Sequence, residues 1–203
     1  MRVGVVDYDA GNLRSVETAL LAIGARIVIS HLPDQLLKSD RLIFPGVGDA
    51  AAAMRVLKSR GLDRAIVEYV RSGRPVLGIC LGSQIVLDSS EENDAVCLGL
   101  IAGSARRFRK ADGLKIPHMG WNQVEPITRH YLFDGIPTGA SFYFVHSYFP
   151  QPGDAGAVIA ETDYGVRFAS AICRDNLSAV QFHPEKSGPY GLQLLRNFLE
   201  HAP

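Results

Sequence analysis

A cysteine flanked by glycines is the feature of this sequence best suited to chemistry. Gly78 and Gly82 lie two residues to either side of Cys80, which follows a short apolar run over 74–79 that predicts a buried strand. A helix is predicted from Gly82 onward, so Cys80 is expected on a strand-to-helix turn. A nucleophile on such a turn needs small neighbours, because its backbone is strained and both elements crowd it. The first helical amides favour a thiolate, and the Leu81 amide is placed to donate to an oxyanion.

A candidate base and a carboxylate lie about a hundred residues later. His183 ends a predicted strand over 178–183, and Pro184 favours an extended backbone before it. His183 and Glu185, two residues apart, can then point the same way. A cysteine activated by histidine, with a carboxylate that fixes the ring tautomer, is a general arrangement for acyl transfer. Taken singly, Cys80 could be a small buried hydrophobe and His183 a surface residue before a turn. The flanking glycines favour the catalytic interpretation.

A second glycine turn, Gly46-Val47-Gly48, follows a predicted strand over 41–44. Glycines after a strand let backbone amides approach a phosphate or an oxyanion. Such a motif alone is more often only a tight turn. Because its strand directly precedes the Cys80 strand among the predicted strands, we expect the turn beside the thiol and favour the oxyanion interpretation.

Composition narrows the choice of partner. The chain has 203 residues, 47% of them hydrophobic, with 21 basic and 21 acidic residues and a formal net charge of zero. This balance gives no overall field to hold nucleic acid or an anionic membrane, so a small molecule or a protein is the expected partner. The three cysteines, Cys80, Cys97 and Cys173, cannot pair completely and have no metal-binding spacing. Without an export signal or an apolar segment of membrane-spanning length, the expected location is a reducing cytoplasm.

The order of elements predicts an α/β fold. Strands are expected over 2–7, 25–30 and 41–44, with a helix over 12–23 and a helical stretch over 49–70. Such alternation predicts a mostly parallel, doubly wound sheet that binds ligands beyond the carboxyl ends of its strands, where Cys80 lies. The middle of the chain predicts further strands and hairpins, including 141–145, 157–161 and 168–173, and a helix over 187–201 closes the chain. Without a repeat or linker, 1–203 is expected to be one domain.

Several motifs together resemble a known family. The chain resembles class I, triad-type glutamine amidotransferases, which have a flavodoxin-like fold. The resemblance rests on the residues around Cys80, on Gln84 four positions later and on His183-Pro184-Glu185. Further segments resemble, within that family, the glutaminase subunits of imidazole glycerol phosphate synthase, an enzyme of histidine biosynthesis. These segments are 12–15, 45–48, 117–122, 143–148 and 181–187.

The resemblance implies that Cys80 attacks the glutamine carboxamide, that His183 relays the proton to ammonia and that Glu185 orients His183. It places the oxyanion hole at the amides of Leu81 and of the Val47–Gly48 segment. It assigns the amino-acid end of glutamine to Gln84 and to His146, Ser147 and Tyr148. Glu92 could pair with the ammonium of glutamine or lie in a solvated loop, and the sequence favours neither. No cofactor or metal is implied.

The resemblance also implies a partner that receives the ammonia, a separate cyclase subunit with a β/α-barrel fold, which needs about 250 residues. The implied partner-facing residues are Asn12, Arg14, His118, Met119, Trp121 and Asn122. Three alternatives remain: a glutaminase that serves another synthase, a thiol hydrolase or peptidase of similar architecture, and a non-catalytic binding subunit.

Overall fold

The structure is a computed structural model that describes residues 1–9, 13–109 and 114–201. Its largest sheet has eight strands: β1 (Arg2–Val6), β2 (Arg26–Ser30), β3 (Arg41–Gly46), β4 (Val76–Cys80), β9 (Glu125–Pro126), β12 (Val158–Asp163), β13 (Arg167–Arg174) and β14 (Leu177–Val180). Their order is β2-β1-β3-β4-β14-β13-β12-β9. The pairings from β2 to β14 are parallel, and the pairings from β14 to β9 are antiparallel.

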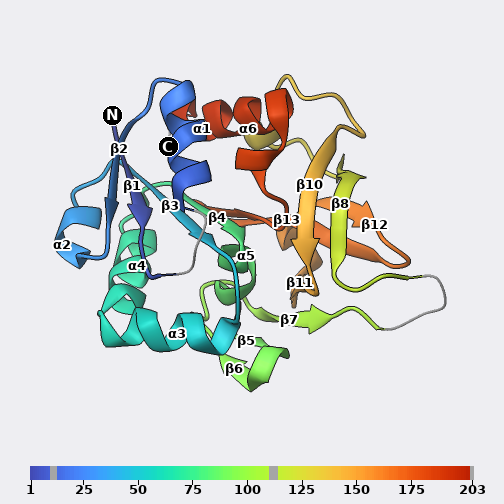
Figure 1. Ribbon diagram of the computed structural model, residues 1–203, viewed down its shortest axis with the longest axis horizontal. Helices are drawn as coiled ribbons and strands as arrows, with labels where there is room; N and C mark the ends of the chain where they lie inside the picture. Colours follow the sequence, from blue (N-terminus) through green and yellow to red (C-terminus); the bar gives the residue numbers. More distant parts are fainter. Residues whose placement is uncertain (10–12, 110–113, 202–203) are drawn as a thin grey trace.

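Helices cover both faces of this sheet (Figure 1). The main ones are α1 (Leu13–Ala22), α3 (Ala50–Ser59), α4 (Leu62–Arg71) and α6 (Gly188–Glu200). α1 and α6 bury their apolar sides in one cluster together with Val5, while α3 and α4 pack in a second cluster together with Val6. Adjacent residues of one strand join different clusters because successive side chains point to opposite faces. The predicted doubly wound arrangement is confirmed.

Smaller elements complete the fold. A two-stranded sheet pairs β8 (His118–Gln123) with β10 (Ser141–His146), and a four-stranded sheet joins β5 (Ser89–Ser90), β6 (Ala95–Val96), β7 (Gly103–Arg107) and β11 (Tyr148–Pro152). The short helices are α2 (Pro33–Leu36) and α5 (Leu81–Ile85). Single 3₁₀ turns span η1 (Glu92–Asp94), η2 (Tyr131–Phe133), η3 (Ala155–Ala157) and η4 (Pro184–Lys186).

Three predicted elements differ from the structure. The helical stretch over 49–70 is two helices, because Gly61 adopts a left-handed conformation (φ +68°) between them. The helix after Cys80 begins at Leu81 and spans only five residues. The strand before His183 ends at Val180, so His183 and Glu185 lie in the loop and 3₁₀ turn beyond it.

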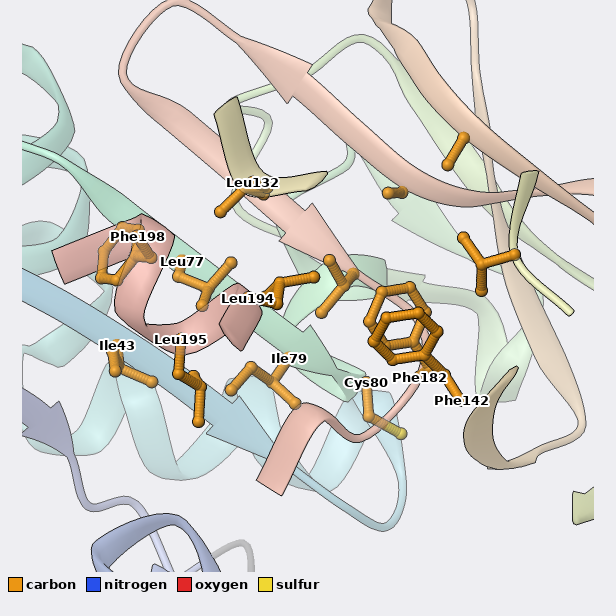
Figure 2. Packing of buried hydrophobic residues seen from close by; sticks show 14 of the residues in the cluster. Ile43, Leu77, Ile79, Cys80, Leu132, Phe142, Phe182, Leu194, Leu195 and Phe198 are labelled. Atoms are coloured by element: carbon orange, nitrogen blue, oxygen red, sulfur yellow. The ribbon is translucent and has the colours of Figure 1, made fainter. Parts of the chain in front are cut away.

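The sheet brings the two glycine turns of the sequence together. β3 and β4 are parallel neighbours, and their register pairs Gly46 with Cys80. Both residues end their strands, so the turn after Gly46 begins next to the thiol. In Figure 2, Cys80 lies at one end of a buried row that continues through Ile79 and Leu77, beside the rings of Phe142 and Phe182. The candidate site therefore stands on a rigid apolar support.

Candidate active site

Cys80 has the strained backbone that the sequence predicts. Its φ and ψ are 53° and −107°, outside the regions that non-glycine residues normally occupy. A Cβ at Gly82 would lie 2.1 Å from the carbonyl oxygen of Phe44, and a Cβ at Gly78 would lie 3.0 Å from both the Ala179 Cβ and the Gly82 oxygen. The flanking residues must therefore be glycines because strand and helix touch there. Strain of this kind is typical of functional sites, where surrounding structure holds it in place.

Leu81, whose amide is a candidate oxyanion donor, is the first residue of α5. The first amides of a helix have no partner within the helix, so they can donate to an anion. The Cys80 side chain is only 5% exposed. A negative charge that forms on a substrate here would be held by fixed dipoles with little competition from water.

His183 and Glu185 form a buried pair. His183 Nδ1 lies 2.8 Å from Glu185 Oε1, and both side chains are 2% exposed. The 3₁₀ turn that begins at Pro184 produces this contact, rather than the strand alternation expected from the sequence. Ser187 Oγ donates to the His183 carbonyl oxygen at 2.6 Å, and the His183 amide donates to the Tyr143 carbonyl oxygen at 2.9 Å. The backbone of His183 is thus fixed at its amide and at its carbonyl, while Glu185 holds the ring through Nδ1.

The electrostatics of His183 link it to Cys80. Burial alone lowers the pKa of the imidazole, but the negative charge and hydrogen bonding of Cys80, together with the Glu185 carboxylate, outweigh burial and raise the pKa to about 10. Because Nδ1 faces Glu185, Nε2 is the ring nitrogen left to exchange a proton with the thiol or a leaving group. The arrangement can hold a thiolate–imidazolium pair.

The second glycine turn continues from Gly46, which is paired with Cys80 in the register of β3 and β4. Gly48 has a φ of +105°, and no atom lies within 4 Å of where its Cβ would be. Gly46 is crowded instead, since a Cβ there would lie 1.8 Å from the Tyr8 hydroxyl. Tyr8 is buried, and its hydroxyl has no hydrogen-bond partner among the described residues. Burial, followed by the charge of Cys80, raises the pKa of this hydroxyl. Tyr8 did not emerge from the sequence, which gives it no motif.

The side-chain amide of Gln84 is hydrogen-bonded to two residues near Cys80. Gln84 Nε2 donates to the Tyr148 carbonyl oxygen at 2.9 Å and to Gln181 Oε1 at 3.0 Å. Gln181 Nε2 in turn donates to Cys80 Sγ at 3.7 Å. Gln181 was not among the predicted site residues, although in the strand expected over 178–183 it would point to the same side as His183, two residues later. That spacing was the signal that could have found it.

The histidine predicted near glutamine and the one predicted at the partner surface are hydrogen-bonded to each other. His146 Nδ1 lies 2.7 Å from the Tyr148 carbonyl oxygen, and His146 Nε2 lies 2.9 Å from His118 Nδ1. Both rings are buried, at 6% and 2% exposure. Burial lowers the pKa of His118 to about 4 and that of His146 to about 3, so both rings are neutral at pH 7. His118 therefore lies beneath the surface on which the sequence placed it. Ser147, between the two segments, accepts a hydrogen bond from the Phe108 amide through its carbonyl oxygen.

Glu92 is half-buried and hydrogen-bonded rather than solvated in a loop. Its carboxylate accepts a hydrogen bond of 2.8 Å from the Ala50 amide, the first residue of α3. Burial, opposed by this hydrogen bond, raises the pKa of the carboxyl. Glu92 is thus half-buried and holds the helix that follows the second glycine turn, and the structure leaves its relation to glutamine open to proposal.

The residues expected to face a partner divide by exposure. Met119 and Trp121 are 61% and 59% exposed on β8, while Asn122, on the opposite side of the strand, is half-buried. Arg14 is exposed and lines a hollow of ≈ 650 Å³ that Glu185 also lines. Asn12 lies outside the described residues.

Within 1–9, 13–109 and 114–201, no three His, Cys, Asp or Glu side chains gather as a metal would require. No helix in this described part of the chain has the length and apolar character needed to cross a membrane.

Comparison with known proteins identifies the family. The model of the class-I glutamine amidotransferase family matches residues 4–202. The chain belongs to this family. An imidazole glycerol phosphate synthase subunit HisH of Dehalococcoides mccartyi is 47% identical over 201 residues, which cover 98% of this chain and 97% of the relative. A subunit of the same name from Nitrosococcus oceani is 50% identical over 202 residues, which cover 97% of this chain and 96% of the relative.

Solved structures agree on the fold of this amidotransferase. A crystal structure described as a glutamine amidotransferase superposes with a TM-score of 0.76 at 20% sequence identity, and covers 98% of this chain and 97% of that one. The structure of PurLQS from Thermotoga maritima gives the same TM-score, identity and coverage. At this identity the likeness concerns the fold alone. Together with the family match and the relatives, it indicates an enzyme of the glutaminase type.

Proposed function

We propose that this chain is the glutaminase subunit of an imidazole glycerol phosphate synthase, which hydrolyses glutamine to glutamate and ammonia for histidine biosynthesis. The observation that carries the chemistry is the buried His183–Glu185 pair, whose Nδ1–Oε1 distance is 2.8 Å, next to a strained Cys80 in a class-I amidotransferase. The relatives named above support the specific synthase. The proposal treats 1–203 as one amidotransferase domain.

In the proposed mechanism the Cys80 thiolate attacks the carboxamide carbon of glutamine. The amides of Leu81 and of the Val47–Gly48 segment stabilise the oxyanion, and removal of one such donor typically costs about 2.7 to 4 kcal/mol. His183 gives its Nε2 proton to the departing ammonia, which leaves a thioester. His183 then takes a proton from water as the water attacks, and glutamate leaves with return of the thiolate. Glu185 orients the ring throughout.

Binding of glutamine is assigned to the segments next to the thiol. His146 ends β10, Tyr148 begins β11 and Ser147 lies between the two strands. Gln84 Nε2 donates to the Tyr148 carbonyl oxygen at 2.9 Å. We propose that this backbone holds the amino-acid end of glutamine. Glu92, anchored at the start of α3, is proposed to face the ammonium group at longer range.

The proposed partner is a separate cyclase subunit with a β/α-barrel fold, which receives the ammonia. Exposed Met119 and Trp121 support a docking surface on β8, because large exposed apolar side chains often mark interfaces. Arg14 and Asn12 are proposed to extend this surface, with Asn122 and His118 behind it. All three cysteines are free thiols, which fits a cytoplasmic location.

The test is glutamine hydrolysis by the chain, alone and with a cyclase and its nucleotide. We expect slow hydrolysis by the isolated chain and faster hydrolysis in the complex, because the Gly48 turn can change the direction of its peptides. Cys80→Ala should reduce the complex to below about a thousandth of the parent rate. A full rate without cyclase, or none with it, would contradict the synthase assignment and favour a hydrolase or another amidotransferase complex.

A glutamine-like electrophile gives an independent check by mass mapping. Cys97 and Cys173 serve as internal controls, because burial raises the pKa of Cys97 to about 11 and also raises that of Cys173. We expect modification of Cys80 alone. Equal modification of the three thiols would remove the support for a selective nucleophile.

A further inference from the structure

An unbroken series of hydrogen bonds joins strand β8 to the sulfur of Cys80. It begins at Asn122 Nδ2, which lies 3.2 Å from His118 Nε2, and continues from His118 Nδ1 to His146 Nε2 at 2.9 Å. It then passes from His146 Nδ1 to the Tyr148 carbonyl oxygen at 2.7 Å. Gln84 connects that oxygen to Gln181, and Gln181 Nε2 reaches Cys80 Sγ at 3.7 Å.

The donor and acceptor in each histidine hydrogen bond follow from the Tyr148 carbonyl oxygen, at which the histidine part of the series ends. A carbonyl oxygen only accepts, so His146 Nδ1 carries the hydrogen and, in a neutral ring, Nε2 must accept. His118 Nδ1 is therefore a donor, and His118 Nε2 accepts from Asn122. The Asn122 side chain is itself fixed, since its Oδ1 accepts from the Gln123 amide and its Nδ2 also donates to the Asp163 carbonyl oxygen. One tautomer of each ring satisfies the whole series.

The side-chain amides of Gln84 and Gln181, which link Tyr148 to Cys80, also have only one orientation that satisfies their hydrogen bonds. Gln84 Nε2 has two hydrogens, which point to the Tyr148 carbonyl oxygen and to Gln181 Oε1. Gln181 Oε1 is thereby committed as an acceptor, so its Nε2 is the group turned toward Cys80 Sγ. Gln181 and Gln84 are 0% and 4% exposed, so water does not replace these contacts readily.

We propose that this series positions the reacting groups: Gln181 holds the Cys80 sulfur, and the His118–His146 pair holds the Tyr148 backbone against which glutamine would lie. Gln181, His146, His118 and Asn122 are positioning residues that act through Cys80 and Tyr148. The series also gives β8, the strand that exposes Met119 and Trp121, a physical connection to the nucleophile. The part that concerns glutamine rests on the proposed function, whereas the part that concerns the thiol does not.

The first experiment measures the rate of Cys80 alkylation by iodoacetamide in the full chain, without glutamine. Gln181→Met keeps the side-chain length but removes the donor, and we expect alkylation to slow about tenfold because a hydrogen bond to a charged sulfur is lost. Ser170→Ala is the matched control. Its buried hydroxyl has no partner among the described residues and its carbonyl accepts from the Gln181 amide, so the parent rate is expected. A parent rate in folded Gln181→Met, or equal slowing in Ser170→Ala, would overturn the proposal.

The second experiment separates KM from kcat in glutamine hydrolysis by the complex. His146→Leu removes the donor to Tyr148 and should raise KM about tenfold with a smaller change in kcat. His146→Asn places an amide nitrogen near the position of Nδ1 and should restore most of the affinity. Equal KM values for these two variants would show that the hydrogen bond does not position the segment, and would overturn this part of the proposal.

A third variant tests how far the series extends and remains informative if Gln181→Met does not fold. Asn122→Leu lies at the half-buried end on β8 and removes the amide that fixes His118. We expect a rise in KM of about threefold in the same direction as His146→Leu, since the His118 ring is then free to turn. An unchanged KM together with an unchanged alkylation rate would overturn the connection to β8. Absence of hydrolysis by the parent complex, with the expected alkylation rates, would refute the proposed function alone.

Discussion

The buried His118–His146 pair should make the protein unusually sensitive to mild acid. Burial in the folded protein lowers the pKa of His118 to about 4 and that of His146 to about 3, while an unfolded histidine titrates at 6.5. Below pH 6.5 the unfolded chain therefore binds protons that the folded chain does not bind. The free energy of unfolding must then fall as the pH falls, until the folded pKa values are reached.

The magnitude follows from the same values. Each histidine contributes a slope of about 1.4 kcal/mol per pH unit below pH 6.5, so only the last ~1.5 units of an acidification from about pH 7.5 to about pH 5 count. The cost is about 2 kcal/mol for each ring and about 4 kcal/mol for the pair. A loss of this size is a large part of the 5 to 15 kcal/mol that typically stabilises a domain, so it should be visible as a lower urea midpoint. His183 acts in the opposite direction between pH 7.5 and 6.5, because its pKa is raised to about 10 and the stability it gives is lost as the pH rises from 6.5 through about 10. This contribution is the same in the parent and in a variant that lacks only the other two histidines, so it cancels when they are compared.

The assay is urea unfolding followed by far-ultraviolet circular dichroism at several pH values. The double variant His118→Asn with His146→Asn keeps amide donors near the Nδ1 positions but removes both titrating groups. It should be less stable than the parent at pH 7.5, yet lose about 4 kcal/mol less on acidification to pH 5. The carboxylates and His130, whose pKa burial lowers to about 4, are common to both proteins and cancel in the comparison.

A control distinguishes titration from general damage to this cluster. Phe168 is 2% exposed, and its ring centroid lies 5.9 Å from that of His118 and 5.3 Å from that of His146. Phe168→Leu should lower stability at every pH but keep the slope of the parent. If the double variant and the parent show the same slope between pH 5 and 6.5, the two histidines bind protons in the folded state and the reasoning is refuted.

Three further outcomes are expected from the geometry of the site. Cys80→Gly should be about 1 kcal/mol more stable in thermal or urea unfolding than Cys80→Ala, against the usual order, because the φ of +53° strains any residue with a Cβ; a more stable alanine variant would argue against this strain. Gly82→Ala should lower the free energy of unfolding by more than about 3 kcal/mol, since its Cβ would lie 2.1 Å from a backbone oxygen, while Gly153→Ala, with its nearest contact at 3.7 Å, should cost less than about 1 kcal/mol. Similar costs for the two alanines would show that the elbow relaxes. Tyr8→Phe should leave the free energy of unfolding in urea unchanged or raise it by up to about 1 kcal/mol, because it removes a buried hydroxyl that has no hydrogen-bond partner among the described residues. A loss of stability would show that this hydroxyl does have a partner.

Local sequence patterns were sufficient for the parts of this protein that depend on neighbours along the chain. The apolar runs predicted the parallel strands β1 to β4, and Gly78 and Gly82 predicted the elbow at Cys80, because close approach of strand and helix leaves room only for glycine. The spacing of His183 and Glu185 indicated that they could meet. The motifs together indicated the amidotransferase family, which the family match confirms.

Only the tertiary structure decided which distant residues meet. The register of β3 with β4 places Gly46 beside Cys80, and the 3₁₀ turn after His183, rather than a strand, brings Glu185 to the ring. The family resemblance placed His118 at a partner surface, and the sequence of a short strand does not show which of its faces will be buried. Packing against β10 buries it with His146, and burial then sets the charge of both rings. Gln181 gained its contact with the thiol in the same way, since a hydrogen bond across about a hundred residues depends on chain topology that no local pattern contains.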